Sequence, residues 1–303
     1  MTFEIGIYWY LLGYYINMTK LSVAIATFNE EANIGDCLKS VKDIADEIVI
    51  VDGTSSDKTV EIAKQYGAKV TVTENHANFH INKQKSFDLS KGEWILYLDA
   101  DERVSPGLAK EIQKVINLSE EEIEKYQATL LHKKLFDRHQ QLLEERDGSI
   151  GKKQGEYVAF FFPRLNYFLG KYLRYGGVYP DGVIRLFKRN KAYLPAKDVH
   201  EQMVVMGRVG WLEHDLLHID SPTFDRYIKR NNRYIDLLAL QLKEEKVKKN
   251  LTNFINYEII KPINWFLMTQ IRHKGILDGV QGIIFSFFSA LRFPRAYWRY
   301  IHS

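Results

Sequence analysis

Cysteine is nearly absent from this chain of 303 residues, which contains only Cys37. A single cysteine excludes a disulfide framework and a cysteine-based zinc cluster, and it is typical of proteins from a reducing compartment. Proline is also scarce, with seven residues, whereas 46% of the residues are apolar and 26% are charged. This composition argues against long disordered segments, and the length allows two modest domains or one domain with an appendage.

Long hydrophobic runs are missing as well. Residues 5–16 are apolar, but they are shorter than the ~17–25 residues that a membrane-spanning helix needs. Glu4 precedes them where a secretory signal would carry positive charge, and no small-residue cleavage site follows. Met18 stands just before the first expected strand. We therefore interpret residues 1–17 either as a native apolar extension or as a stretch upstream of a start at Met18.

The formal net charge of +4 conceals an uneven distribution. Residues 219–303 contain 14 Lys and Arg against 7 Asp and Glu, a charge of +7, so residues 1–218 carry −3. An acidic body followed by a basic, aromatic tail indicates that the two parts meet different partners.

The first hundred residues alternate short apolar runs with stretches of helical periodicity. The expected strands are Leu21–Ala26, Glu47–Val51, Lys69–Thr73 and Glu93–Leu98. The expected helices are Glu30–Val41, Asp57–Tyr66 and residues 81–90. This alternation predicts right-handed βαβ units and a largely parallel sheet, in which ligands collect at the carboxyl ends of the strands.

Polar residues follow three of the four expected strands, in Thr27–Glu30, Asp52–Asp57 and Asp99–Glu102. None of these stretches is a GxGxxG or GxxxxGK[ST] motif, which argues against a dinucleotide-dependent dehydrogenase and a P-loop kinase. Asp99 and Asp101 are two residues apart on an extended chain, so their side chains can point the same way. Two such carboxylates favour a hard cation such as Mg²⁺ or Mn²⁺; the alternative is an acidic turn before a helix.

The other two strand ends also allow two interpretations each. Asp52, before Gly53, is interpreted as a contact to a nucleobase or ribose, the alternative being a turn-forming aspartate. Glu30 would contact the nucleotide or favour a helix N-terminus through the macrodipole. Asp57 is expected mainly to cap the helix that follows it.

The three stretches Thr27–Glu30, Asp52–Asp57 and Trp94–Glu102, in this order and spacing, resemble the family-2 glycosyltransferases. They are most like the bacterial branch that includes lipopolysaccharide-core β-glucosyltransferases. The resemblance covers the chain from about residue 20 and implies an α/β GT-A fold, which is Rossmann-like with a mostly parallel sheet flanked by helices. It also implies an inverting, Mg²⁺- or Mn²⁺-dependent enzyme that uses a nucleotide-diphosphate sugar.

Carried over position by position, the resemblance implies a nucleotide-sugar site formed by Thr27, Glu30, Asp52, Lys83 and Asp99. Asp52 would contact uracil or ribose, Asp99 would contact ribose or sugar, and Asp101 would hold the metal. Lys83 would steady the diphosphate; its alternative is a solvated helix face shared with Lys85.

The acceptor side is expected in the second half of the catalytic region. Residues 156–180 contain nine aromatic residues, which suit either the walls of a sugar or lipid site or an ordinary core. An inverting displacement needs a base opposite the leaving group, and the resemblance favours Glu201 in Asp198–Glu201. The sequence itself does not distinguish Glu201 from Asp181 or Asp215. Further acceptor-side candidates are His200, Asp181 and Tyr179, and His218 is either a metal ligand or part of the core.

The basic tail predicts helices. Ser221 followed by Pro222 is a typical helix start, and this helix is expected to run to about Lys246. Basic and aromatic residues then alternate near the end, at Arg292, Phe293, Arg295, Tyr297, Trp298, Arg299 and Tyr300. This pattern favours an amphipathic helix in the headgroup region of an anionic membrane; a helical subdomain is the alternative. No nucleic acid is expected as a partner, because no nucleic-acid-binding motif accompanies the basic residues.

These observations predict an inverting transferase that moves a hexose from UDP-glucose or a similar donor to a lipid-linked or lipopolysaccharide-core saccharide. The alternatives are a polyprenyl-phosphate glycosyltransferase and a non-catalytic sugar-nucleotide-binding membrane scaffold. An Asp-x-Asp phosphatase fits less well, because its pair would follow the first strand. The GT-A domain is expected over residues 18–218, with a nucleotide-sugar half to about 116 and an acceptor half from about 117. Residues 219–303 are expected to attach it to the inner, cytoplasmic face of the cytoplasmic membrane.

Overall fold

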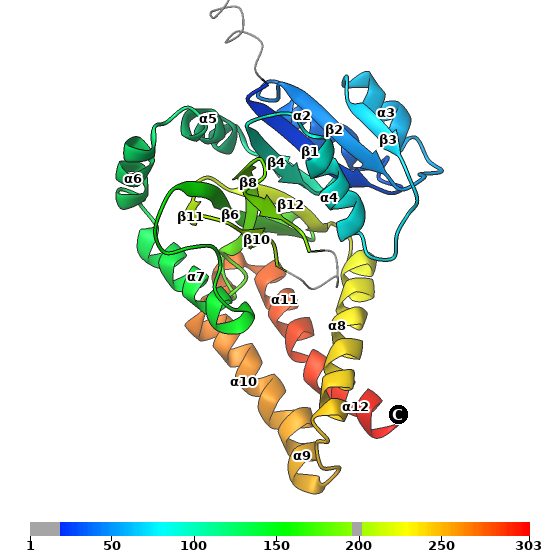
Figure 1. The fold of residues 1–303 in the computed structure, drawn as a ribbon. Helices are drawn as coiled ribbons and strands as arrows, with labels where there is room; N and C mark the ends of the chain where they lie inside the picture. The colour runs from blue at the N-terminus through cyan, green and yellow to red at the C-terminus, as the bar shows by residue number, and fades with distance from the viewer. Residues whose placement is uncertain (1–18, 196–201) are drawn as a thin grey trace, which may run out of the picture. The chain divides into compact units, whose positions relative to one another are not determined.

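The computed structural model describes residues 19–195 and 202–303 (Figure 1). These residues form two compact units. The first comprises Met1–Pro163 and Gly182–Leu216, and the second comprises Arg164–Asp181 and Leu217–Ser303. The interpretations of residues 1–17, and those of Asp198, His200 and Glu201, lie outside the described residues.

The first unit contains a parallel sheet with the strand order β3-β2-β1-β4. Its strands are β1 (Leu21–Thr27), β2 (Glu47–Asp52), β3 (Lys69–Val72) and β4 (Trp94–Leu98). Each lies within a residue of its predicted bounds. Beyond β4 the sheet continues with β8 (Asp181–Lys188), which is antiparallel to β4, and then with β6 (Tyr157–Phe168). Beside β6 lies β11 (Arg208–Trp211), in parallel. The predicted α/β class with a mostly parallel core sheet is confirmed.

Alternating strand residues bury opposite faces of this sheet. On one face, Val23 of β1 and Leu96 of β4 pack with the helices α2 (Ile34–Val41), α3 (Thr59–Gln65) and α5 (Pro106–Val115). On the other face, Ala24 and Tyr97 pack with Phe87 of α4 (His80–Leu89). Burial on both faces explains why the strands are nearly continuous apolar runs. The polar residues at their ends are therefore held at one edge of a rigid sheet.

The remaining elements of the first unit follow Asp99–Asp101 or connect the later strands. They are β5 (Glu102–Val104), α6 (Glu120–Ala128), α7 (Lys133–Asp147), β9 (Ala192–Tyr193) and β10 (Val204–Val205). Ser105 caps α5, because its hydroxyl accepts the amide of Leu108 and Pro106 occupies the first turn.

The second unit is mainly helical. It contains β7 (Lys171–Tyr172), β12 (Leu216–Ser221), α8 (Phe224–Glu244), α9 (Leu251–Ile255), α10 (Lys261–Leu267), α11 (Val280–Ala290) and α12 (Arg292–Ile301). Two π-helical turns, η1 (Asn256–Ile260) and η2 (Met268–Arg272), adjoin α10, and a 3₁₀ turn, η3 (Gly275–Asp278), precedes α11. Within the described parts of the chain, no helix is long and apolar enough to span a bilayer.

The predicted start of the first tail helix is wrong by two residues. Ser221 is the last residue of β12, where it is fully buried and its hydroxyl donates to Asp220. Thr223 caps α8 instead, and its side chain accepts the amide of Arg226. The strand continues through Ser221 because that side chain faces the interior, so the chain becomes free to turn only after Pro222.

The aromatic residues of α12 are used largely inside the second unit. Tyr297 and Tyr300 are buried in a cluster with Leu242 and Tyr257. Arg299 forms an ion pair with Asp236 of α8. Part of the alternation of basic and aromatic residues near the end of the chain is therefore used in packing within this helical unit, which is compatible with the predicted membrane contact and leaves it a prediction.

Candidate functional site

The ends of β1 and β2 are joined by a buried polar network. Thr27 and Asp52 are partners in the parallel register, and the Thr27 hydroxyl donates to Asp52 Oδ2 at 2.8 Å. Asp52 is fully buried and also accepts the amide and the hydroxyl of Ser55, at 2.7 and 2.6 Å. These bonds give Asp52 the turn-forming role; its contact to a nucleobase or ribose stays a prediction.

The two loops that follow β1 and β2 have unusual backbone conformations. Asn29 has φ of 54° and Thr54 has φ of 66°, a region that a β-branched residue rarely adopts. A Cβ atom at Gly53 would lie 3.1–3.2 Å from atoms of Asn75, so the chain is close-packed there. Asn29 Oδ1 accepts the amide of Ser56 at 2.9 Å, which ties the loops together. Strained, cross-linked loops of this kind cluster at ligand sites.

Glu30 and Asp57 make local contacts at the starts of α2 and α3. The Glu30 carboxylate accepts the side-chain amide of Asn33 at 2.8 Å. Asp57 accepts the amides of Thr59 and Glu31, at 3.0 and 3.1 Å. Desolvation opposes ionisation of Asp57, but its hydrogen bonds from Thr59 outweigh this and lower its pKa. Asp57 thus accepts an amide of the first turn of α3, but Lys58 occupies the N-cap position and α3 begins two residues later than predicted.

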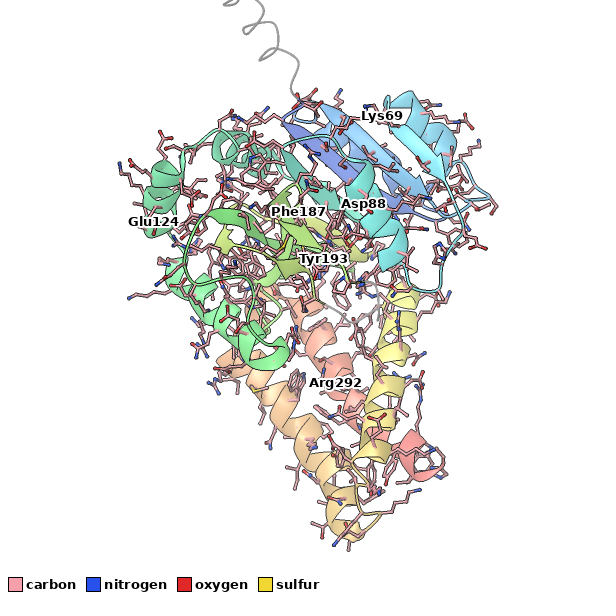
Figure 2. The ribbon with its side chains drawn as sticks, in the orientation of Figure 1. Lys69, Asp88, Glu124, Phe187, Tyr193 and Arg292 are labelled. Carbon is pink, nitrogen blue, oxygen red and sulfur yellow. The ribbon has the colours of Figure 1, made fainter. Side chains whose placement is uncertain are left out.

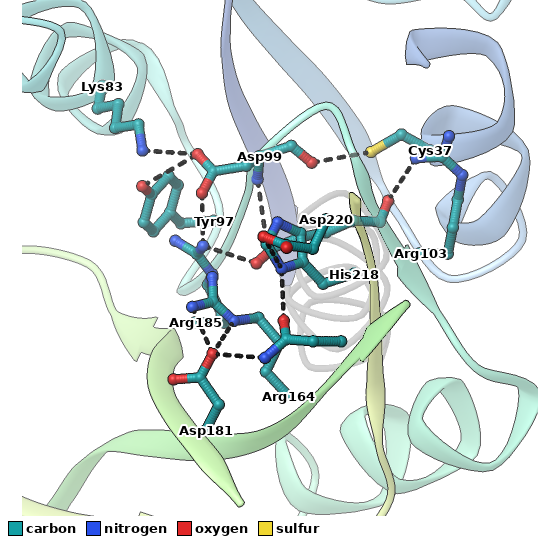
Figure 3. A network of polar contacts seen from close by, with 12 residues as sticks. Cys37, Lys83, Tyr97, Asp99, Arg103, Arg164, Asp181, Arg185, His218 and Asp220 are labelled. Atoms are coloured by element: carbon teal, nitrogen blue, oxygen red, sulfur yellow. Dashed lines mark hydrogen bonds and ion pairs between the residues drawn. The ribbon is translucent and has the colours of Figure 1, made fainter. Parts of the chain in front are cut away.

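At the end of β4, two cations converge on one carboxylate (Figure 3). Lys83 of α4 places its ammonium 2.6 Å from Asp99 Oδ1, and Arg185 of β8 places Nη2 2.6 Å from Asp99 Oδ2. Arg185 also contacts Glu102 Oε1 at 2.7 Å, and Glu102 Oε2 accepts the amide of Asp99 at 3.0 Å. The guanidinium lies over the ring of Tyr97, 4.3 Å from its centroid.

Electrostatics favour the charged forms of both cations. Burial disfavours the charged form of Lys83, but the attraction of the Asp99 carboxylate outweighs the effect of burial and raises the pKa of Lys83. Burial likewise works against Arg185, and Asp99 and Glu102 together raise its pKa. Arg185 Nε has no hydrogen-bond partner among the described residues although it is buried. This N–H and the Lys83 ammonium are suited to contact an anionic ligand at the edge of the sheet.

Asp101 lies half-buried in the turn between β4 and β5. The part of the chain that the structure describes has no group of three or more His, Cys, Asp or Glu side chains placed to hold a metal. A single hard carboxylate still fits Mg²⁺ or Mn²⁺, which take few protein ligands and complete their coordination with water and phosphate oxygens. Lys83 and Arg185 hold the Asp99 carboxylate, and Asp101 stays the predicted metal ligand.

Within the second unit, Asp181 belongs to a separate polar cluster. Arg164 and Asn166 donate to Asp181 Oδ2 at 2.7 and 3.1 Å, and a ring nitrogen of His218 lies 2.6 Å from Asn166 Oδ1. Burial raises the pKa of Asp181, but Arg164 outweighs it and the net pKa is lowered. Tyr179, the third acceptor-side candidate, has the Arg174 guanidinium 5.2 Å from its ring centroid.

Sequence reasoning missed Arg185 and Glu102 as members of the site. Both are buried, and they anchor the carboxylate of Asp99. The available signal was an arginine inside the apolar run Val183–Phe187, because a charge in a buried strand requires a carboxylate partner. The sequence alone could not say which carboxylate that would be.

Comparisons with known proteins agree with this geometry. An uncharacterized glycosyltransferase of Rickettsia typhi is 44% identical over 100 residues, which cover 32% of this chain and 33% of that protein. A similar protein of Rickettsia bellii is 46% identical over 98 residues, so the match spans about a third of the length of these relatives. The lipopolysaccharide core biosynthesis glycosyltransferase LpsC of Rhizobium meliloti is 25% identical over 290 residues, covering 90% of this chain and 91% of its own.

A solved structure of glucosyl-3-phosphoglycerate synthase from Mycobacterium tuberculosis is 23% identical and covers 28% of this chain and 34% of its own, with a TM-score of 0.26. That likeness is too small to support an argument. The family model of glycosyl transferase family 2 matches residues 22–189, which include β1 without its first residue, β2 to β4, all of β8 and both cations that contact Asp99. The sheet has the GT-A-like arrangement that the motifs imply, and the chain belongs to glycosyl transferase family 2.

Proposed function

We propose that this protein is an inverting, metal-dependent hexosyltransferase that moves glucose or a similar hexose from a UDP-sugar to a lipid-linked or lipopolysaccharide-core saccharide. Family membership supports the transferase activity, and the similarity to LpsC along 90% of this chain supports a cell-envelope acceptor. The observation that carries the proposal is the cation pair, Lys83 and Arg185, held on Asp99 at the carboxyl end of β4.

The chain supplies separate contacts for the parts of such a donor. The loops after β1 and β2, held by Thr27 and Asp52, would bind the nucleoside, with Glu30 beside them. Lys83 and the free Nε of Arg185 would bind phosphate oxygens. A divalent cation on Asp101 would neutralise charge that develops on the leaving diphosphate. Fixed cations act in the same direction without needing to rearrange during the reaction.

The acceptor hydroxyl must lose a proton to a base on the side opposite the diphosphate. Glu201 remains our candidate for this base, with His200 as its partner or as an acceptor contact. Asp181 is less suited, because Arg164 and Asn166 already hold its carboxylate and Arg164 lowers its pKa. Asp181 and Tyr179 are retained as acceptor-side contacts.

The experiment is a donor assay with Mn²⁺ and a panel of nucleotide sugars, in which release of the nucleoside diphosphate is measured. We expect turnover of a UDP-hexose by the full chain and its loss in Asp101→Ala. Asp43→Ala replaces an exposed aspartate of the same unit and should keep full activity. A panel with no bound or hydrolysed donor, or an Asp101→Ala variant with unchanged turnover, contradicts the proposal. Full turnover by Glu201→Gln would remove Glu201 as the base.

We also propose that the second unit attaches the enzyme to the inner face of the cytoplasmic membrane. Exposed apolar residues recur every four positions along the helical segment from α9 to η2, at Ile255, Ile259, Ile263, Leu267 and Ile271. Residues 246–274 contain six Lys and Arg against one acidic residue. An apolar stripe with neighbouring cations is typical of helices that lie in an anionic headgroup region. The proposed membrane contact is therefore this stripe rather than α12.

A further inference from the structure

A cavity of about 370 Å³ lies wholly within the second unit. Its walls come from the end of β6, from β12, α8 and α11, and from Arg292, the first residue of α12. Small-molecule sites usually occupy ~300–1,000 Å³, so this cavity has room for a ligand of about monosaccharide size. None of the residues placed around the donor in the first unit lines it.

The charges that line the cavity do not balance. Arg164 is paired with Asp181, and Arg230 is paired with Asp220. Arg292, which is labelled in Figure 2, forms no ion pair with any carboxylate of the described residues. Its guanidinium instead lies over the rings of Trp265 and Phe293, 4.1 and 4.8 Å from their centroids. Among the described residues, the positive charge of Arg292 is therefore offset by aromatic rings and by no carboxylate.

This charge is partly removed from water. Burial lowers the pKa of Arg292, and the nearby Tyr227 hydroxyl offsets only part of that effect. A buried charge without a counter-ion is costly, so an anion that entered the cavity would be favoured there. A guanidinium also binds a carboxylate or a phosphate through two parallel hydrogen bonds, which orients the bound group.

Five of the other residues that line the cavity are aromatic, namely Tyr167, Phe168, Tyr227, Tyr234 and Phe285. Phe168 makes edge contacts with Tyr227 and Phe285, with ring centroids 4.9 and 5.6 Å apart. Asn166 and Asn231 add amide groups between these apolar surfaces. Apolar walls with a few fixed polar groups suit a sugar ring, which has apolar C–H faces and hydroxyl groups at its rim.

We propose that this cavity binds a saccharide carrying a carboxylate or phosphate group, with Arg292 holding the anionic group and the aromatic rings holding the sugar. The inference rests on the proposed transferase function, since such a saccharide would be the acceptor or a neighbouring residue of it. It narrows the acceptor class from any envelope saccharide to an anionic one.

Calorimetric titration of the full chain tests this with four probes: glucose 6-phosphate, glucuronate, glucose and inorganic phosphate. We expect at least one anionic sugar to bind at least about tenfold more tightly than both glucose and inorganic phosphate, because both parts of the ligand make contacts. The two anionic sugars distinguish a phosphate-bearing acceptor from a sugar acid. Arg292→Gln should weaken their binding at least about tenfold, and Arg292→Lys should restore part of it. Arg233→Gln removes an exposed arginine of α8 outside the cavity and should change nothing.

The probe comparison uses the unaltered protein, so it decides the matter even where a variant does not fold. The proposal is overturned if glucose or inorganic phosphate binds as tightly as the anionic sugars. It is also overturned if none of the four probes binds. Equal losses in Arg292→Gln and Arg233→Gln also overturn it. UDP-sugar binding is measured on the same protein. Anionic-sugar binding without donor binding rejects the transferase proposal alone, and the reverse result rejects the cavity proposal alone.

Discussion

At the scale of single residues, Arg185 connects the stability of the fold to the candidate site. Its side chain is only 6% exposed and contacts Asp99 and the fully buried Glu102. The contacts therefore serve two purposes. They hold the Asp99 carboxylate at the edge of the sheet, and they compensate a charge that is removed from water.

Arg185→Gln should lower the free energy of unfolding by about 3–5 kcal/mol, because it leaves Glu102 buried without a counter-ion. Urea denaturation measures the loss. Arg189→Gln, at an exposed arginine four residues further along, removes one hydrogen bond to the carbonyl of Gly92 and should cost no more than about 1.5 kcal/mol. Adding Glu102→Gln to Arg185→Gln should recover part of the stability. Similar losses at positions 185 and 189 would contradict the assigned role.

Asp181 gives a pH-dependent prediction at the same scale. Its folded-state pKa lies below the ordinary value for aspartate of about 3.9. The contribution of its pair with Arg164 is therefore fully present above that ordinary value, and it is lost as the pH falls through the lower folded-state pKa. We expect Asp181→Asn to reduce the Tm at pH 6 and to reduce it less near pH 3. Thermal denaturation at both pH values measures the difference. A deficit that stays the same at both would show that the Asp181 charge is not responsible.

At the scale of elements, Ser221 and Thr223 are the two candidate caps for the start of α8, and a substitution distinguishes them. Thr223→Ala should cost about 1 kcal/mol, because the amide of Arg226 loses the side chain that accepts its hydrogen bond. Chemical denaturation provides the measurement. Thr252→Ala, at an exposed threonine in the first turn of α9, is the control and should stay within about 0.5 kcal/mol. If Thr223→Ala is equally silent, Thr223 does not act as the cap.

The elements also show how far sequence reasoning reaches. The strands of the parallel sheet were predicted to within a residue, because burial on both faces makes each one an uninterrupted apolar run. Helix starts were less accurate: α2 begins at Ile34 rather than Glu30, since Asn29 and Glu30 form a turn tied to the next loop. Periodicity marks the apolar face of a helix, but it does not indicate where a polar loop ends.

The candidate site was predictable only in part for a related reason. Asp99 and Lys83 were identified from their motifs, and the structure brings them together at 2.6 Å. Arg185 lies 86 positions further along the chain than Asp99, so their contact depends on β8 pairing with β4. The tail has a comparable ambiguity, because basic and aromatic residues in α12 suit a membrane and a neighbouring helix equally well. The packing of Tyr297 and Tyr300 shows the contact with neighbouring helices, and the membrane contact stays a prediction.

At the scale of the whole molecule, the structure sharpens the separation of charge. Residues 164–181 belong to the second unit, which then contains 17 Lys and Arg against 8 Asp and Glu, a formal charge of +9. The first unit consequently carries −5. An anionic surface is expected to attract the second unit and to repel the first.

Flotation with phosphatidylglycerol-containing vesicles tests the membrane proposal. We expect the full chain to float with them and the double variant Ile263→Glu/Ile271→Glu to lose most of this binding, because both substitutions place charge in the exposed stripe. Leu131→Glu, at a highly exposed leucine of the first unit, should float normally. Unchanged flotation of the double variant would reject the stripe as the contact. Point substitutions are preferred to deletion of residues 219–303, because Phe168 and Leu173 pack on Tyr227 and would be left exposed.

The assignment of residues 164–181 to the second unit also has a consequence for biosynthesis. This segment leaves the ribosome before β12 and the helices that complete its core, since about 120 residues separate Asp181 from the end of α12. At roughly 5–20 residues per second, it waits for about 6–24 s with Phe168 and Leu173 uncovered. The strands β3, β2, β1, β4 and β8 can pair during that interval, because the last of them ends at Lys188. The nascent chain thus passes through a stage at which the donor side is formed but the helices of the second unit are not yet synthesised. This is the stage at which chaperones would act.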